Sequence, residues 1–239
     1  MEYSALNEDF SFTCPICHGN SFKTEPKKIC RDCRARTRTR AMALAIKQIP
    51  VNVNNKPVYH FAPEQALQEY LIKIYGNSYI PADFSPELYS DWSKVPVQKV
   101  DLSEPLLYLP KNGVYGLIHS HVLEHIPCSI DKAISEMNDS IISGGFHLLC
   151  VPIHNGWYRE DMDPDMPAQQ RDEAFYQHDH LRVFGDMDFQ ERLLRLFQKE
   201  FIRVDLSKAI DRNTAIKAAI PKGIFSDNTG TTPFLFIKL

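Results

Sequence analysis

The stretch His121-Val122-Leu123-Glu124-His125-Ile126-Pro127 decides which fold this sequence predicts. An apolar run of strand length, residues 114–118, lies just before it. Just after it, apolar residues recur at helical spacing over 129–142. A buried strand that ends in a polar turn and leads into a helix places that turn at the carboxyl edge of an α/β sheet. Ligands bind at that edge in such folds, so this turn is the first candidate for a functional site.

The chain on both sides of this turn alternates strand and helix patterns, which is typical of a parallel sheet covered by helices. We expect strands at 58–62, 79–84, 99–102, 113–120 and 146–151, helices at 64–75, 129–142 and 187–197, and a terminal hairpin from 201–206 and 233–239. Two stretches, 152–186 and 207–232, fit neither pattern. Long irregular segments of this kind are usually lids or binding loops.

Composition and charge narrow the class of protein. Of the 239 residues, 44% are hydrophobic and 24% are charged, as in an ordinary soluble globular protein. The net charge of −3 argues against a surface that grips nucleic acid throughout. No apolar run approaches the roughly 18–20 residues of a membrane span. Residues 1–9 are acidic, lack the apolar core of a secretory signal and suggest a loose tail, so a cytoplasmic location is expected.

Four of the six cysteines form two tight pairs. Cys14 and Cys17 are separated from Cys30 and Cys33 by twelve residues. Two such pairs bring four thiolates to tetrahedral spacing, which is how structural zinc is held. A closed four-thiolate set leaves no open coordination position, so this zinc would be structural rather than catalytic. We therefore expect a zinc ribbon and a linker helix over 1–50, followed by a separate domain over 51–239.

Two motifs resemble those of a known family. His121–Pro127 resembles the motif after the fourth strand of class I S-adenosylmethionine (SAM)-dependent methyltransferases. The segment His60-Phe61-Ala62-Pro63-Glu64 resembles the turn after the first strand in a bacterial subset of that family, which also carries an N-terminal four-cysteine ribbon. The resemblance implies an α/β fold: a Rossmann-like, seven-stranded methyltransferase sheet over 51–239, with a lid-like insertion near 153–186. The usual Gly-x-Gly of the first turn is absent, although Ala62 is small.

The same resemblance implies where SAM would bind. The turn after the first strand would approach the cofactor, a carboxylate after the second strand would bind the ribose, and a pair after the third would border the adenine. His121 would lie beside the methionine portion. The expected cofactor-binding residues are His60, Ala62, Pro63, Glu64, Asp83, Asp101, Leu102 and His121. The alternatives are an ordinary strand end without a ligand and, for Asp83, a helix cap or solvated turn.

The segment 176–185 is the expected acceptor side, because it concentrates two imidazoles, a carboxylate and a guanidinium. Methyl transfer to a hydroxyl or amine needs a base with a near-neutral pKa. His180 or His178 is the expected base, with Asp179 to orient one of them. Arg182 would clamp an acidic or phosphorylated group of the substrate, and Glu124 is the other expected substrate-binding residue. A structural polar network, or a metal bound by His178, Asp179 and His180, are open alternatives.

Four arginines follow the ribbon, at positions 34, 36, 38 and 40. They fit either nucleic-acid docking or a helix start that forms salt bridges with the main domain. The favoured function is SAM-dependent methyl transfer to a small polar acceptor, such as a sugar or another biosynthetic intermediate. The rivals are a non-catalytic binding protein of the same fold, an RNA-directed methyltransferase and a metal-dependent hydrolase. The sequence indicates neither the acceptor nor an oligomeric state.

Overall fold

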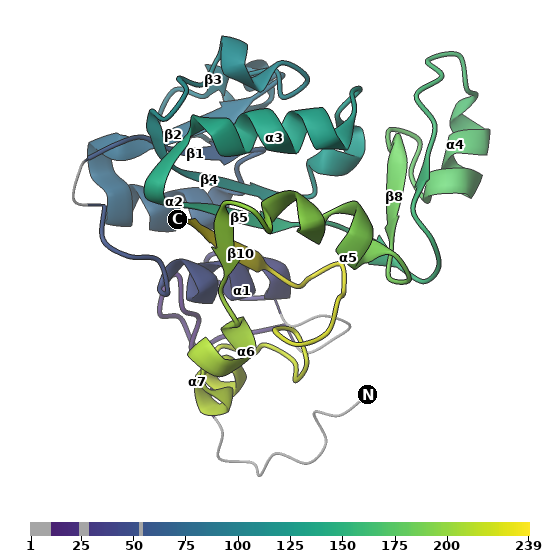
Figure 1. The fold of residues 1–239 in the computed structure, drawn as a ribbon. Helices are drawn as coiled ribbons and strands as arrows, with labels where there is room; N and C mark the ends of the chain where they lie inside the picture. Colours follow the sequence, from purple (N-terminus) through teal and green to yellow (C-terminus); the bar gives the residue numbers. More distant parts are fainter. Residues whose placement is uncertain (1–10, 24–28, 53–54) are drawn as a thin grey trace.

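The computed structural model describes residues 11–23, 29–52 and 55–239, so the acidic tail expected over 1–9 lies outside the described residues. At its centre is a seven-stranded sheet with the order β3-β2-β1-β4-β5-β10-β9 (Figure 1). Strands β1 to β5 are parallel, whereas β10 runs antiparallel to both β5 and β9. This arrangement confirms the predicted Rossmann-like sheet and its terminal hairpin.

The described elements of the main body have the following bounds: α1 Thr37–Ile46, β1 Val58–Phe61, α2 Gln65–Tyr75, η1 Gly76–Ser78, β2 Tyr79–Asp83, η2 Pro86–Tyr89, β3 Gln98–Lys99, η3 Pro105–Leu107, β4 Val114–Ser120, η4 Leu123–His125, α3 Ile130–Ser140, β5 Ile141–Cys150, α5 Phe189–Arg192, η5 Leu194–Phe197, β9 Phe201–Arg203, α6 Leu206–Ala209, α7 Arg212–Lys217 and β10 Phe234–Lys238.

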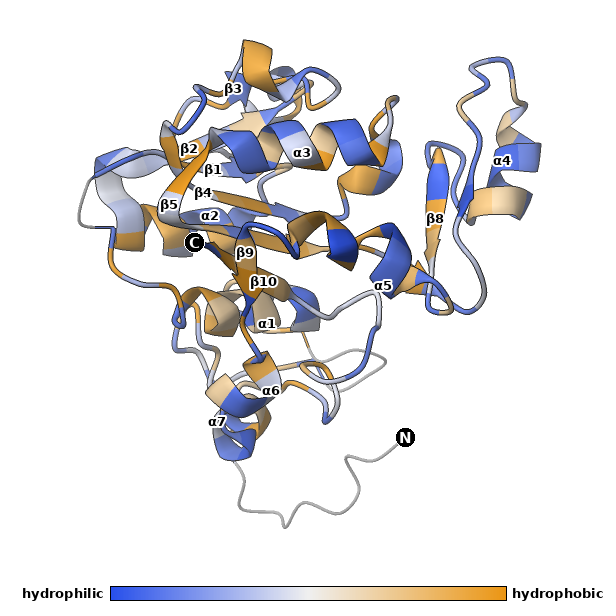
Figure 2. Ribbon diagram, viewed as in Figure 1, coloured by the Kyte–Doolittle hydropathy of each residue, from blue (hydrophilic) through white to orange (hydrophobic). Residues whose placement is uncertain are grey.

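The central strands are buried along their whole length. Every residue of β1 and of β4 is buried, as expected for parallel strands that helices cover on both faces. Figure 2 shows these inner strands as largely hydrophobic and the surrounding helices as mixed. Gly116 in β4 is required by close packing, because a Cβ there would lie 2.0 Å from the ring of Phe146. The sheet therefore forms the rigid base on which the loops at its carboxyl edge stand.

The helices pack on the sheet through two hydrophobic clusters, one on each face. One contains the apolar side of α3 together with α5 and η5. The other contains α1 and α2 and also takes in Cys14, Ile16 and Cys30 of the ribbon. α1 and α3 accordingly lie on opposite sides of the sheet (Figure 1). The helix expected as a linker is thus part of the core of the main domain.

The ribbon segment is joined to the C-terminal part of the chain. The backbone N–H of Thr13 donates to the carbonyl of Lys217 at 2.7 Å, and Phe22 forms a β-bridge with Cys30. The guanidinium of Arg40 in α1 donates to the carbonyls of Ala218 and Ala219, each at 2.7 Å. Segments from the two ends of the sequence therefore pack together beneath the sheet.

The two stretches that were expected to be irregular contain short elements instead. Residues 153–186, called the insertion below, form β6 Ile153–His154, β7 Arg159–Glu160, α4 Ala168–Phe175 and β8 Arg182–Gly185. Its three strands make a second sheet of order β6-β8-β7, which stands out from the main body together with α4 (Figure 1). Helices α6 and α7 lie in the 206–217 region, and the helix expected at 187–197 is divided into α5 and η5. Strands of two residues are too short to show a hydrophobic period, which is why the sequence did not predict them.

Within the described residues, none of the helices combines the length and the apolar character that crossing a membrane would require.

Candidate functional site

A pocket of about 550 Å³ lies at the carboxyl edge of the main sheet. The turns after β1, β2, β3 and β4 each contribute to it, as the sequence predicted for this edge. Asp179 of the insertion also lines it. The lining residues are Phe61, Ala62, Asp83, Phe84, Val100, Asp101, Leu102, His121, Val122, His125, Ile126, Pro127 and Asp179. Its volume lies within the range of about 300–1,000 Å³ that is typical of small-molecule sites.

Two of the lining residues have a left-handed backbone without being glycine. Ala62 has a φ of 47° and His121 has a φ of 57°. Their backbones are held in place, since Ala62 N–H donates to Ala82 and His121 N–H donates to Cys150. Conformations of this kind cost about 1–3 kcal/mol each and gather at functional sites. Ala62 thus supplies the sharp turn for which a glycine would be expected.

The two aspartates of the pocket are fixed by their own turns. Asp83 accepts a hydrogen bond from the N–H of Ser85 at 2.8 Å and one from the hydroxyl of Tyr89 at 2.7 Å. Asp101 accepts from the N–H and the hydroxyl of Ser103, at 2.8 and 2.6 Å. Each carboxylate oxygen has two lone pairs, so both groups retain the capacity to bind ligand hydroxyls or amines.

Three residues expected at the cofactor lie elsewhere. His60 is buried, with Nδ1 3.0 Å from the hydroxyl of Tyr79, and burial lowers its pKa to about 4. Pro63 is buried outside the pocket lining. Glu64 forms an ion pair with Arg38 and accepts a hydrogen bond from Thr39 at 2.5 Å. Burial would raise the pKa of Glu64, but Arg38 and Thr39 outweigh it and the net shift is downward.

Neither His60 nor Glu64 is among the residues that line the pocket. Successive side chains of a strand point to opposite faces, so His60 lies on the face opposite to Tyr59 and Phe61. Glu64 instead fastens the start of α2 to α1. The ion pair between Arg38 and Glu64 is therefore one of the predicted salt bridges to the main domain.

A buried carboxylate, Glu124 in η4, lies behind the pocket wall. Its side chain is fully buried, and neither oxygen accepts a hydrogen bond from another residue of the described chain. Oε1 lies 3.6 Å from Nδ1 of His121 and 4.0 Å from Nε2 of His125. In this environment burial raises the pKa of Glu124 to about 8. Burying a carboxylate without hydrogen-bond partners costs free energy of folding, so its presence here suggests a function.

Three imidazoles surround this carboxylate, each with one ring nitrogen on a backbone carbonyl. The pairs are His121 Nε2 with Gly230 at 2.8 Å, His125 Nδ1 with Asp179 at 3.1 Å, and His180 Nδ1 with Phe175 at 3.0 Å. A carbonyl only accepts, so these nitrogens carry the proton in the neutral rings and the other nitrogens carry lone pairs. The rings of His125 and His180 contact each other edge to face at 4.8 Å.

The expected trio His178, Asp179 and His180 does not converge. His178 is exposed, and its nearest acid is Asp172 at 3.9 Å. Asp179 lies beside His125 instead, with Oδ2 3.4 Å from Nδ1 of that ring. His180 is buried and points into the molecule toward His125. These three side chains are therefore not grouped as a metal site among the described residues.

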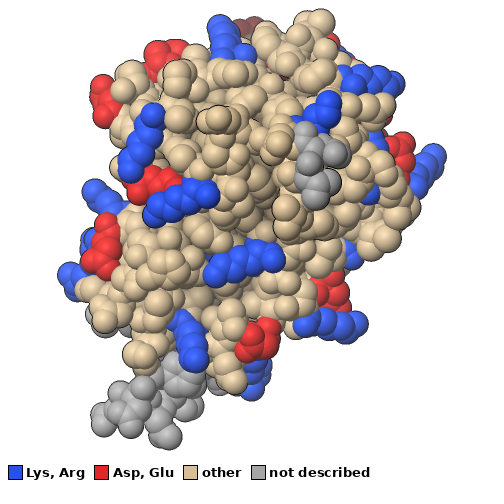
Figure 3. Space-filling view, turned by 90° about the vertical axis from the view of Figure 1, so that its left-hand side faces the viewer, with Lys and Arg blue, Asp and Glu red and all other residues tan. Residues whose placement is uncertain are grey.

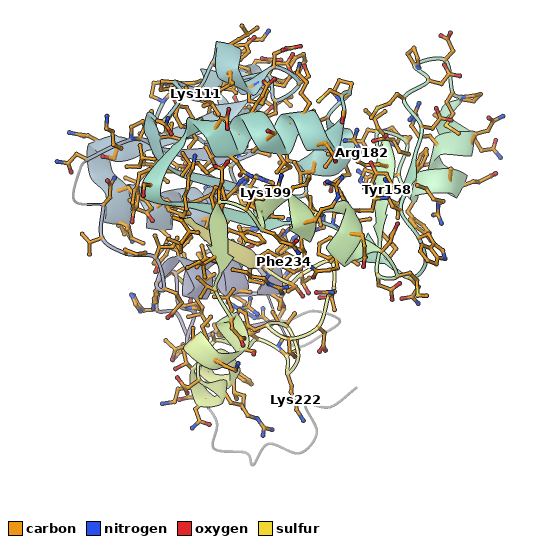
Figure 4. All side chains as sticks on the ribbon, viewed as in Figure 1. Lys111, Tyr158, Arg182, Lys199, Lys222 and Phe234 are labelled. Carbon is orange, nitrogen blue, oxygen red and sulfur yellow. The ribbon has the colours of Figure 1, made fainter. Side chains whose placement is uncertain are left out.

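Arg182 is likewise not at the pocket. Its guanidinium is fully buried and donates to Glu160 at 2.8 Å, to the carbonyl of Cys128 at 2.8 Å and to the carbonyl of Leu123. Figure 4 places it at the junction between β8 and the main body. These bonds use the guanidinium to hold the insertion against the turn after β4, and a role as a substrate clamp stays a prediction.

His125 lines the pocket, although it was not among the residues expected at the site. Its spacing from His121 was the available signal, because residues four apart lie on one side of a helical turn. Only Leu123–His125 is helical, as η4, and His121 precedes it with a left-handed backbone, but both imidazoles line the pocket.

The arginine run does not form a basic face. Arg38 is paired with Glu64 and Arg40 is fully buried, which leaves Arg34 and Arg36 exposed. The face in Figure 3 carries Lys and Arg interspersed with Asp and Glu. The helix-start interpretation of these arginines accounts for their contacts better than nucleic-acid docking does.

The four ribbon cysteines lie close together. Sγ of Cys14 is 3.6 Å from Sγ of Cys33, and Sγ of Cys17 is 3.5 Å from Sγ of Cys30. All four sulfur atoms lie within 4.8 Å of one another. Zinc–sulfur bonds of about 2.3 Å in a tetrahedron place sulfurs about 3.8 Å apart, so this set can form a zinc site.

No family model matches the sequence, and no curated protein matches it. A SAM-dependent methyltransferase from Archaeoglobus fulgidus is similar in structure, with a TM-score of 0.51 and 16% identity over 84% of this chain and 93% of that chain. A chain of the complex between the Haloferax volcanii Trm112 methyltransferase activator and a methyltransferase gives 0.50 and 12%, over 84% and 88%. The chain has the Rossmann-like methyltransferase fold. Identities this low establish the fold and leave the reaction to be argued from the site.

Proposed function

We propose that this protein is a SAM-dependent methyltransferase that acts on a small polar acceptor. The observation that carries the proposal is the pocket at the carboxyl edge, where Ala62, Asp83, Asp101, Leu102 and His121 come together from four strand ends. This is the edge at which such sheets bind nucleotide-like ligands. The cytoplasmic location and the small-molecule partner expected from the sequence belong to the same proposal.

The residues of the pocket fit the parts of the cofactor. Asp83 would accept hydrogen bonds from the ribose hydroxyls, and Asp101 with Leu102 would border the adenine. The left-handed turn at Ala62 lets the backbone approach the ligand closely. His121 would lie beside the methionine portion. When bound, SAM supplies an electrophilic methyl group on a sulfonium.

The acceptor would lie in the part of the pocket near His121, His125 and Asp179. Transfer needs the acceptor atom in line with the breaking bond, which the walls of the pocket must enforce. His125 contacts this space directly, with Asp179 holding its Nδ1. His180, the base expected from the sequence, is separated from the pocket and would act on an acceptor only through His125 or a shared ligand.

The ribbon would hold a structural Zn²⁺ through Cys14, Cys17, Cys30 and Cys33. A four-thiolate site is closed, so we assign it to stability and not to catalysis. A hydrolase would need a metal held by His178, Asp179 and His180, and these side chains do not converge. RNA docking would use the arginine run, but Arg38 is paired with Glu64 and Arg40 is buried.

Calorimetry with SAM and S-adenosylhomocysteine tests the proposal. Zinc-loaded wild type should bind both in the micromolar range. Asp83→Asn should weaken binding about tenfold or more, since about 1.4 kcal/mol corresponds to a factor of ten.

Tyr89→Phe is the matched control, because it removes the hydroxyl that bonds Asp83 but keeps the carboxylate. It should change the affinity by less than about threefold, which is under about 0.7 kcal/mol. If folded wild-type protein binds neither ligand, the methyltransferase assignment is wrong. If both variants lose affinity equally, Asp83 supports the loop and does not contact the ribose.

A further inference from the structure

Glu124 is an isolated buried carboxylate in the described chain. Its two oxygens are buried and unpartnered within the described chain, and Oε1 lies 3.6 Å from Nδ1 of His121 and 4.0 Å from Nε2 of His125. Hydrogen bonds of the N–H···O type span about 2.7–3.2 Å, so these gaps are too long for direct bonds. The carboxylate and the two rings are therefore close neighbours that no direct hydrogen bond joins.

The surrounding imidazoles are oriented as metal-binding imidazoles are. A ligating histidine usually donates its other ring N–H to a backbone carbonyl or a carboxylate, which fixes the tautomer and the ring. His125 and His180 both do so, through the carbonyls of Asp179 and Phe175. The nitrogens that remain carry lone pairs, so these two rings and the carboxylate offer three ligand atoms.

We propose that Glu124, His125 and His180 bind one divalent transition-metal ion at the wall of the pocket. One ligand atom from each of the three lies within 4.8 Å of the others. Metal–ligand bonds of about 2.0–2.2 Å place two ligands of one ion about 3–4 Å apart. The 4.0 Å between Oε1 of Glu124 and Nε2 of His125 is already in that range, so small side-chain shifts complete the site.

The donor set indicates the kind of metal. Two imidazoles with one carboxylate are a frequent set for catalytic zinc and for non-haem iron, whereas calcium and magnesium prefer oxygen ligands alone. Three protein ligands leave at least one open position. Because His125 lines the pocket and the other two ligands are buried behind it, that position faces the pocket.

The open position defines a class of acceptor. If the pocket transfers methyl groups as proposed above, the site selects acceptors that offer an oxygen ligand, such as a hydroxyl or carboxylate. This consequence rests on the proposed function, whereas the metal site itself does not.

Cobalt(II) is a suitable probe because it reports its own ligands. Zinc-loaded protein is freed of weakly held metal with a mild chelator and titrated with Co²⁺, with visible absorption and metal analysis as readouts. We expect one Co²⁺ per chain in addition to the ribbon's zinc. Its spectrum should lack a thiolate-to-cobalt charge-transfer band, because the site contains no sulfur.

Three variants make the assignment specific. Glu124→Gln and His180→Gln keep the size of the side chain, or nearly so, and should weaken Co²⁺ binding by about 100-fold or more, or about 2.7 kcal/mol. His178→Gln is the matched control, since this exposed imidazole lies two residues from His180 and outside the site. It should leave the Co²⁺ affinity within about twofold, or about 0.4 kcal/mol. His125→Gln, at a less buried position, provides a further ligand variant if either of the first two fails to fold.

The proposal is overturned if wild type takes up only the ribbon's metal, or if folded Glu124→Gln keeps the wild-type affinity for cobalt. SAM calorimetry on the same preparations separates the two ideas. Cobalt binding without SAM binding would keep the metal site and refute the methyltransferase. SAM binding without cobalt binding would refute the metal site and keep the methyltransferase proposal.

Discussion

Ala62 holds the turn after β1 in a left-handed conformation, with a φ of 47°. A side chain at such a position is strained, and glycine relieves the strain. We expect Ala62→Gly to raise the free energy of unfolding by about 1 kcal/mol or less and to retain SAM binding. Ala62→Val should lower it by about 1–3 kcal/mol, because branched side chains tolerate this region worst. Urea unfolding and calorimetry measure both quantities.

Ala66→Gly, in the first turn of α2, is a useful comparison for this pair. There the same replacement should destabilise, by about 0.5–1 kcal/mol plus the lost packing of a buried methyl group. If Ala62→Gly destabilises as much as Ala66→Gly does, the turn carries no strain of the kind described.

At the scale of single residues, the sequence predicted positions better than roles. Ala62, Asp83, Asp101 and His121 were placed by the strand ends they follow, and they do line one pocket. Their contacts with a cofactor remain predictions. His60 lies outside the pocket lining because residues of one strand alternate between faces, so adjacency to Phe61 implies the opposite side. The proximity of Glu124 to His180 was beyond the sequence, because His180 is more than fifty residues away along the chain.

At the scale of elements, Arg182 in β8 connects the insertion to η4 and the turn that follows it. The fork of its guanidinium reaches Glu160, Leu123 and Cys128 at once, which the single ammonium of a lysine cannot do. We expect Arg182→Lys to lower the free energy of unfolding by about 2–4 kcal/mol. It should also make the insertion more sensitive to limited proteolysis, which together with urea unfolding measures the effect.

Arg192→Lys is the control for this change. Its ion pair with Asp188 is 3.5 Å long and its side chain is 56% exposed, so the replacement should cost less than about 0.5 kcal/mol. Equal stability of Arg182→Lys and Arg192→Lys would mean that the buried guanidinium does not hold the insertion in place.

The elements that the sequence predicted well are those in which a hydrophobic pattern continues over several residues. β1, α2, β2, β4, α3 and β10 follow apolar runs or helical spacing and lie within a few residues of the expected bounds. The insertion did not show such a period, because β6 and β7 have two residues each and depend on pairing with β8. The structure of the insertion depends on contacts between residues far apart in the sequence, such as those of Arg182. The local spacing of hydrophobic residues does not reveal such contacts.

At the scale of the whole molecule, the ribbon and the sheet share one hydrophobic cluster. Cys14, Ile16 and Cys30 pack in it with α1, and Thr13 bonds to Lys217. The division at residue 50 expected from the sequence separates two sequence patterns, whereas the packing continues across it. Unfolding of the ribbon should therefore lower the stability of the sheet.

Removal of the proposed zinc tests this continuity. Zinc-chelated protein, or Cys17→Ser, should melt in a single transition about 10 °C or more below the zinc-loaded wild type, since about 2–4 °C corresponds to 1 kcal/mol in a chain of this size and structural zinc contributes several kcal/mol. Cys128→Ser, which changes a thiol outside the ribbon, should shift the midpoint far less. Scanning calorimetry with metal analysis measures both. Two separate transitions, with that of the sheet unchanged, would show instead that the ribbon folds as an independent unit and that its contacts with α1 and Lys217 add little to the stability of the sheet.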